Sequence, residues 1–102
     1  MARDRIGLDN IFRDILGSDH VYFQPPASVK MKYDAIRYEL DDIVVKHADN
    51  APYHATRRYR VTLITRDPDT RLSDELSKLP LTQFNRFYTA DNLNHYVYII
   101  YY

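Results

Sequence analysis

Hydrophobic residues near the start of the chain recur with the spacing of a helix. Leu8, Ile11, Phe12, Ile15 and Leu16 fall at i, i+3, i+4, i+7 and i+8, which predicts an amphipathic helix over residues 6–16. Gly17 follows at the position where a helix C-terminal cap belongs. A second helix is predicted over residues 71–79, with its leucines along one side, a Thr70 or Ser73 cap before it and Pro80 after it.

Most of the remaining chain alternates with a period of two, which predicts strands. Over residues 35–40 the apolar side chains Ile36, Tyr38 and Leu40 point one way, while Arg37 and Glu39 point the other. Asp41-Asp42 interrupts this strand before Ile43 to Val45 resumes it, which indicates a bulge or a sharp bend. Other strands are predicted over residues 57–65, 82–88 and 95–102, with a short extended stretch over 19–23 and a loop over 89–94.

Two segments differ from ordinary half-buried strands. Residues 96–102 are apolar on both faces, so we expect both sides of this strand to be covered, with help from a neighbouring subunit. Residues 47–56 contain Asp49-Asn50-Ala51-Pro52 and indicate a hairpin loop or a longer arm.

The predicted order of elements is α-β-β-β-α-β-β. We therefore predict an α+β fold in which two helices cover one face of a mostly antiparallel, four- to five-stranded sheet. No linker or repeat divides the sequence, so residues 1–102 are predicted to form a single domain.

Composition removes several classes of protein. The 14 basic residues balance the 14 acidic ones, which argues against a strongly basic nucleic-acid binder. Cysteine is absent, which excludes disulfides and thiolate sites and fits a reducing cytoplasm. The first five residues lack the apolar core of a secretory signal, and no apolar run is long enough to span a bilayer. The ten tyrosines suit strands and protein interfaces alike, whereas two glycines argue against phosphate loops and against tight Asn-Gly or Asp-Gly hairpins.

Candidate catalytic groups are few. Asp91 and His95 have a spacing that permits an oriented base, but a capped turn followed by a strand explains them better. The carboxylate pairs Asp41-Asp42 and Asp67/Asp69 lack the glycine and the distal glutamate of a calcium loop. We therefore predict no catalytic residue, no metal and no cofactor, and a protein that is not an enzyme.

Basic and aromatic residues alternate in two places, Arg57-Arg58-Tyr59-Arg60 and Arg86-Phe87-Tyr88. Such interleaving suits single-stranded nucleic acid, although the neutral net charge favours a solvated or subunit-facing strand. A small nucleic-acid-binding module is therefore retained as an alternative. For an interface with a subunit or partner, we choose the arm and its flank: His47, Tyr53, His54, Arg57 and Arg58.

Three segments have a recognisable sequence: residues 20–26, residues 59–69 and, most specifically, Tyr88-Thr-Ala-Asp-Asn-Leu-Asn-His95. They resemble a family of small proteins encoded in the morphogenesis modules of tailed bacteriophages. In size and element order the chain is similar to the tail terminator, also called the tail-completion or tail-to-head joining protein. The resemblance implies a hexameric ring in the virion neck, assembled in the host cytoplasm, that caps the tail tube and docks to the head-side connector or stopper.

The same resemblance implies that DNA passes through the ring without specific binding and that no membrane is involved. A neutral chain is compatible with such a lumen, because a strongly positive one would retard DNA. A head-closure or stopper protein of the neck is the nearest structural alternative.

Overall fold

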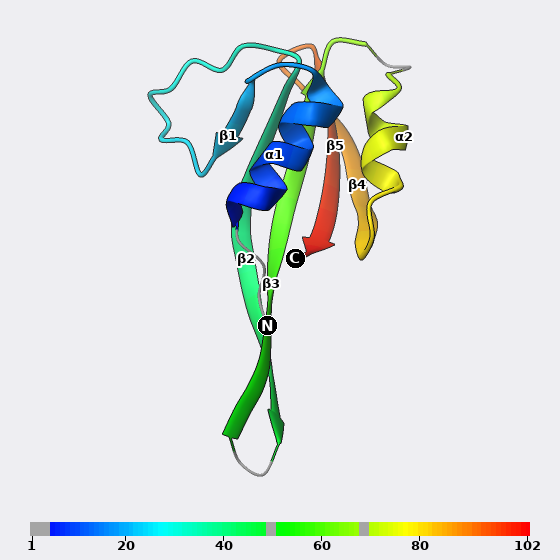
Figure 1. Ribbon diagram of the computed structural model, residues 1–102. Helices are drawn as coiled ribbons and strands as arrows, with labels where there is room; N and C mark the ends of the chain where they lie inside the picture. Colours follow the sequence, from blue (N-terminus) through cyan, green and yellow to red (C-terminus); the bar gives the residue numbers. More distant parts are fainter. Residues whose placement is uncertain (1–4, 49–50, 68–69) are drawn as a thin grey trace.

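The computed structural model describes residues 5–48, 51–67 and 70–102, with the backbone alone for 46–48 and 51–55. The elements are α1 (Arg5–Leu16), β1 (Val21–Phe23), β2 (Ala35–Ala48), β3 (Ala51–Thr65), α2 (Leu72–Ser77), β4 (Thr82–Ala90) and β5 (Leu93–Tyr101). The strands form one sheet in the order β1-β2-β3-β5-β4, with β1 parallel to β2 and every other pair antiparallel (Figure 1). This is the predicted α+β fold and element order, with a mixed sheet.

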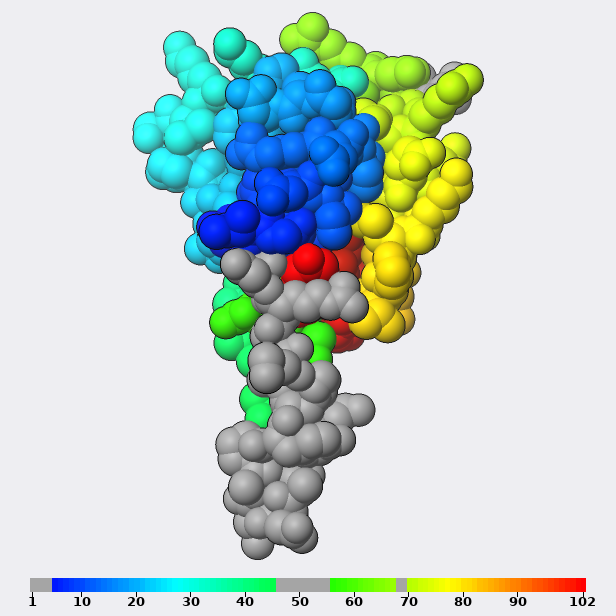
Figure 2. All heavy atoms as spheres, in the orientation of Figure 1, coloured from blue at the N-terminus to red at the C-terminus, as the bar shows by residue number. Residues whose placement is uncertain are grey.

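Both helices pack on the same face of the sheet, and Figure 2 shows this face with α1 between the 24–34 loop and α2. The amphipathic stripe of α1 buries Leu8 and Phe12, and α2 buries Leu76. Gly17 ends α1 with φ +72° and donates its N–H to the carbonyl of Arg13 at 2.9 Å, as the sequence predicts. The hydroxyl of Thr70 accepts the N–H of Leu72 at 3.1 Å just before α2, but the N-cap position is Arg71, and α2 is shorter than the predicted helix.

The core lies between the helices and the sheet. Alternate residues of the three central strands supply it, because the side chains on one face of a strand come from every second residue. Its buried members are Leu8, Phe12, Val21, Ile36, Tyr38, Tyr59, Val61, Leu63, Leu76, Tyr98 and Ile100. The predicted apolar faces of the strands at 35–40 and 57–65 are therefore the faces that the helices cover.

A buried polar network ties α1 to the sheet. The hydroxyl of Tyr38 donates to Oδ2 of Asp9 at 2.6 Å and accepts from Nη1 of Arg5 at 2.9 Å. Nε of Arg13 donates to Oδ1 of Asp9 at 2.6 Å. Burial and the hydrogen bond to Asp9 raise the pKa of Tyr38, so its phenol stays protonated and able to donate.

The strands contain two bulges. Leu40 pairs with Tyr59 and Asp42 with Arg58, so Asp41 is the extra residue that the sequence pattern indicated. In β4 the register shifts between Phe84 and Arg86. This shift lets Phe84 and Phe87, three residues apart, stand on the helix side, where they contact Tyr98 and Tyr96 at ring-centroid distances of 5.5 and 5.0 Å.

β2 and β3 continue beyond the rest of the sheet as a two-stranded arm (Figure 1). The β5 side of β3 ends at Arg57, whose carbonyl accepts the N–H of Tyr102 at 2.8 Å, so the described residues 44–48 and 51–56 pair with each other alone. The segment 47–56 is therefore the longer arm rather than a loop. The predicted Asp67-Pro68-Asp69 turn extends outside the described residues at its last two positions.

The predicted loop over residues 89–94 is wrong. β4 continues to Ala90 and β5 begins at Leu93, so the two strands are joined by a two-residue turn at Asp91-Asn92. Both residues have positive φ, 53° and 62°, as a type I′ hairpin requires. The scarcity of glycine misled the prediction, because Asp and Asn also tolerate the left-handed conformation.

Candidate binding face

The face of the sheet opposite the helices carries the polar residues of four adjacent strands. The register aligns them in rows: Arg37, Thr62, Val97 and Arg86 in one row, and Glu39, Arg60, Ile99 and Gln83 in the next. A third row holds Ala35, Ile64, His95 and Tyr88. We call this surface the open face, because among the described residues neither helix packs on it.

A hollow of about 350 Å³ lies on the open face. Thr62 and Val97, in the middle of the first row, lie at the centre of this hollow, and arginines from three strands surround them. The complete lining is Arg37, Glu39, Arg60, Thr62, Asn85, Arg86, Tyr88 and Val97. Three arginines therefore meet one carboxylate around the hollow.

Two of these arginines are not neutralised by ion pairing. Within the part of the chain that the structure describes, neither Arg37 nor Arg86 forms an ion pair. Arg60 donates through Nη2 to Oδ1 of Asp41 at 3.1 Å, and Arg58 donates through Nε to Oδ2 of the same carboxylate at 2.7 Å. The bulge residue Asp41 thus holds two arginines at one end of the face and leaves two at the other end without a counter-ion.

Aromatic rings lie beside the arginines. Tyr88 stacks on His95 with ring centroids 4.6 Å apart and planes 13° from parallel, and the guanidinium carbon of Arg86 lies 5.1 Å from the centroid of Tyr88. His95 is further fixed by its Nδ1, which is 3.1 Å from the carbonyl oxygen of Leu93. Guanidinium groups therefore lie next to a stacked pair of aromatic rings, an arrangement suited to binding anions that also carry a flat ring.

The last strand is covered in part on the open face by side chains of the same chain. Val97 is only 3% exposed although it lies on the open face, because the flanking side chains of the hollow cover it. The expected contribution of a neighbouring subunit to covering this strand stays a prediction.

The residues chosen from the sequence do not form one cluster. Arg57 and Arg58 are neighbours on β3 and therefore point to opposite faces, with Arg57 on the helix side and Arg58 on the open face. Hydrogen bonds to Tyr101 and Asp41 raise the pKa of Arg58. His47 and His54 lie in the paired part of the arm, but the side chains of His47, Tyr53 and His54 are outside the described residues.

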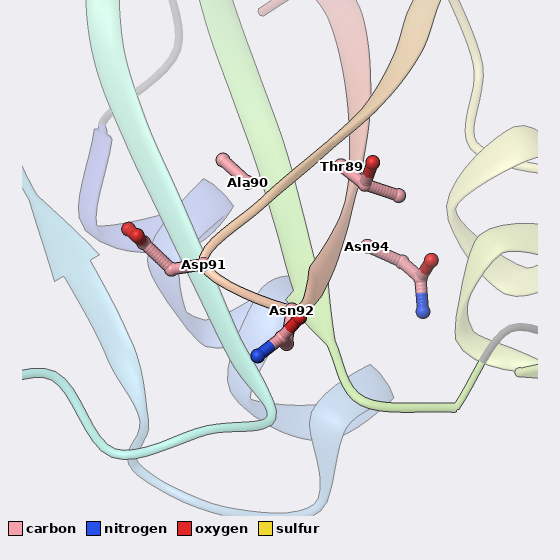
Figure 3. Close-up of a pocket in the computed structure, with 5 residues that line it drawn as sticks. All are labelled: Thr89, Ala90, Asp91, Asn92 and Asn94. Carbon is pink, nitrogen blue, oxygen red and sulfur yellow. The ribbon is translucent and has the colours of Figure 1, made fainter.

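A second hollow, of about 450 Å³, lies at the β4–β5 turn. Its lining residues are Thr89, Ala90, Asp91, Asn92 and Asn94. Figure 3 shows Thr89 and Asn94 on one side of the hairpin and Ala90 and Asp91 on the other, so these side chains do not converge on a common point. Asp91 lies in the two-residue turn, and His95 lies within β5, which begins at Leu93. In the described residues no three His, Asp or Glu side chains gather as metal ligands.

Sequence reasoning missed Arg37, Tyr88 and His95 as members of one site. The alternation of residues 35–40 placed Arg37 on the polar face of its strand, but only the register of β3, β5 and β4 aligns it with Arg86. No local pattern carries that information.

Comparison with known proteins finds no match: no protein-family model and no curated protein matches the chain. None of the described helices has the length and apolar character needed to cross a membrane.

Proposed function

We propose that this protein is a structural subunit of the virion neck in a long-tailed phage, the tail terminator that assembles as a hexameric ring between tail tube and head connector. The observation that carries the proposal is the pair of unpartnered strand edges at different places on one sheet. β4 is the last strand of the sheet, and the arm extends past β5 with no third strand among the described residues.

Unpaired edges of this length present rows of free backbone N–H and C=O groups that another chain can extend. Two-stranded hairpins are only marginally stable alone in water, so the arm gains most from a neighbour. When one edge of a subunit meets a different edge of the next, the interface is heterologous and generates a ring if the rotation closes. These arguments favour assembly over a solitary role.

Exposed apolar side chains accompany both edges. Phe84 and Phe87 in β4 are 56% and 49% exposed, and Ile43 in the arm is 48% exposed. Val44 and Val45 extend the exposed apolar stretch of the arm. Contiguous apolar surface of this kind marks interaction sites.

Mass in solution tests the proposal directly. Light scattering on a size-exclusion column, across protein concentration and salt, is expected to give a hexamer, or a monomer that purified tail tubes convert to a ring. Replacing residues 46–54 by Asn-Gly would join the paired residues Val45 and Ala55 by a two-residue turn and is expected to abolish assembly.

Substitutions in β4 test whether assembly depends on this edge strand rather than on exposed apolar surface in general. Phe84→Ser with Phe87→Ser is expected to give a folded monomer, whereas Ile6→Ser, on α1 and 57% exposed, serves as the matched control and keeps the ring. Recruitment by DNA-filled heads but not by tail tubes would identify the head-closure alternative. A monomer that neither structure recruits would contradict a neck function altogether.

A further inference from the structure

The open face combines three properties that no assembly role requires. It presents arginines from three strands around one hollow, it leaves two of them without a carboxylate, and it sets a stacked Tyr–His pair beside them.

The charge around the hollow points to phosphate. Arg37, Arg60 and Arg86 line the hollow with one carboxylate, Glu39, and Arg60 is also paired with Asp41. Three cations against two carboxylates leave the hollow an excess of positive charge, although the whole chain is neutral. Guanidinium groups offer several N–H donors in a planar fork that matches phosphate oxygens, and an arginine without a counter-ion gives up no ion pair when it binds one.

The spacing of the arginines points to a chain of phosphates rather than a single ion. Arg37 on β2 and Arg86 on β4 lie in one row but are separated by β3 and β5. Three interstrand spacings of about 4.8 Å separate their backbones by roughly 14 Å. Four-stranded sheets that bind RNA hold two or three bases across a similar width.

The aromatic pair points to an unpaired base. Tyr88 is exposed at the edge of the hollow, and its stack on His95 holds the ring in one orientation. Bases stack on such rings only when they are not enclosed in a duplex. The guanidinium of Arg86 lies over the Tyr88 ring and adds a cation to the same platform.

We propose that the open face binds single-stranded nucleic acid, with Arg37, Arg60 and Arg86 on the phosphates and a base on the platform of Tyr88 and His95. This inference does not rest on the neck function, because it uses the sheet face rather than the strand edges and the arm.

Fluorescence anisotropy of the full chain with a labelled oligothymidine of about 15 nucleotides tests the proposal. Affinity is expected to fall as salt rises from about 50 to 200 mM, with a log–log slope near −2 for about three phosphate contacts on a single strand. The double variant Arg37→Ala/Arg86→Ala is expected to make this slope shallower by about 1.4, since two contacts are lost.

Tyr88→Leu separates stacking from charge. It is expected to weaken binding about tenfold or more while leaving the salt slope unchanged, because a lost stack removes no phosphate contact. The charge-matched control Arg71→Ala/Lys78→Ala removes two exposed cations at the ends of α2 and is expected to bind as the unchanged chain does.

Four outcomes would overturn the proposal: no binding at the lowest salt, equal affinity for a blunt duplex of the same length, no effect of Tyr88→Leu, or an equal loss in the Arg71/Lys78 control. A fifth is a change of oligomeric mass in the Arg37/Arg86 variant without any oligonucleotide binding, which would assign the open face to contact between copies. Circular dichroism of every variant distinguishes lost binding from lost folding.

Discussion

Replacing Tyr38 by Phe removes one oxygen atom from the contact between α1 and the sheet. The ring remains in place against Phe12, Phe23 and Tyr59, at centroid distances of 5.1, 5.0 and 6.0 Å. What disappears is the donor to Asp9 at 2.6 Å and the acceptor for Arg5 at 2.9 Å. The variant therefore isolates hydrogen bonding from packing.

The expected loss follows from the charge of the partner. A hydrogen bond to a charged group contributes about 1.5–3 kcal/mol, and a neutral one about 1 kcal/mol. Asp9 has a side chain only 15% exposed, but it keeps Arg13 at 2.6 Å, so it is not left without a partner. We expect Tyr38→Phe to lower the free energy of unfolding by about 2 kcal/mol. With an unfolding entropy of about 2.1 cal/mol/K per residue, this corresponds to a melting temperature lower by about 9 °C.

Tyr98→Phe is the matched control. Tyr98 is also buried, but its hydroxyl donates to the carbonyl of Ser73 at 3.0 Å and meets the hydroxyl of Ser77 at 3.4 Å, both neutral partners. Its removal is expected to cost about 1 kcal/mol. Urea unfolding followed by circular dichroism measures both losses, and equal m-values establish that the transitions compare the same states.

A double-mutant cycle with Asp9→Asn assigns the difference to one contact. The sum of the losses in unfolding free energy for the two single variants is expected to exceed the loss for the double variant, because each single variant removes the same hydrogen bond. Equal losses in Tyr38→Phe and Tyr98→Phe, or strict additivity with Asp9→Asn, would refute the reasoning from charge.

Three further predictions concern single residues. Burial opposes ionisation of Asp9, but hydrogen bonds from Tyr38 and Arg13 and the nearby positive charges outweigh it and lower its pKa. The stability that this shift contributes is present above the unfolded pKa of about 3.9 and is lost as pH falls through the folded pKa. Urea unfolding is therefore expected to show a free energy of unfolding that declines from about pH 5 to 2, and Asp9→Asn is expected to reduce this decline. Gly17→Ala meets no atom within 4 Å but forces φ +72° on a residue with a Cβ, so thermal unfolding is expected to show a loss of about 1 kcal/mol, and an unchanged melting temperature would contradict the left-handed cap. Asn92→Gly, at φ 62° in the β4–β5 turn, is expected to raise stability by about 0.5 kcal/mol and Asn92→Val to lower it by about 1 kcal/mol, and the reverse order in urea unfolding would exclude a type I′ turn.

The strands that alternate cleanly were predictable together with their faces. Ile36 and Tyr38 of the first segment and Tyr59, Val61 and Leu63 of the second lie in the core, and Asp41-Asp42 marks the bulge between regular segments. Leu40, at the end of the first segment, is 39% exposed. Local pattern is sufficient here because burial of one face imposes the period of two. The parallel pairing of β1 with β2 was not predictable, since three residues carry too short a pattern to indicate a partner.

The candidate site was predictable only in parts. Arg57, Arg58 and Arg60 attract attention as a run, yet alternation sends Arg57 to the helix side and Asp41 binds the other two. The residues that line the hollow without counter-ions, Arg37 and Arg86, are far apart in sequence and meet through three strand registers. Local pattern predicts the face of a strand, but the neighbours across a sheet depend on long-range pairing.

The strand order has a consequence for the time course of folding. The pairs β2–β3 and β4–β5 are each joined by a two-residue connection, so each hairpin can close within microseconds. The join between them, where β3 pairs with β5 across α2, requires contacts distant in sequence and carries the larger entropy cost of loop closure. The slow step of folding is therefore expected to be the pairing of two preformed hairpins along β3 and β5. Truncating Val61 or Tyr98, which pair across these strands, should slow refolding more than altering the Asp91-Asn92 turn.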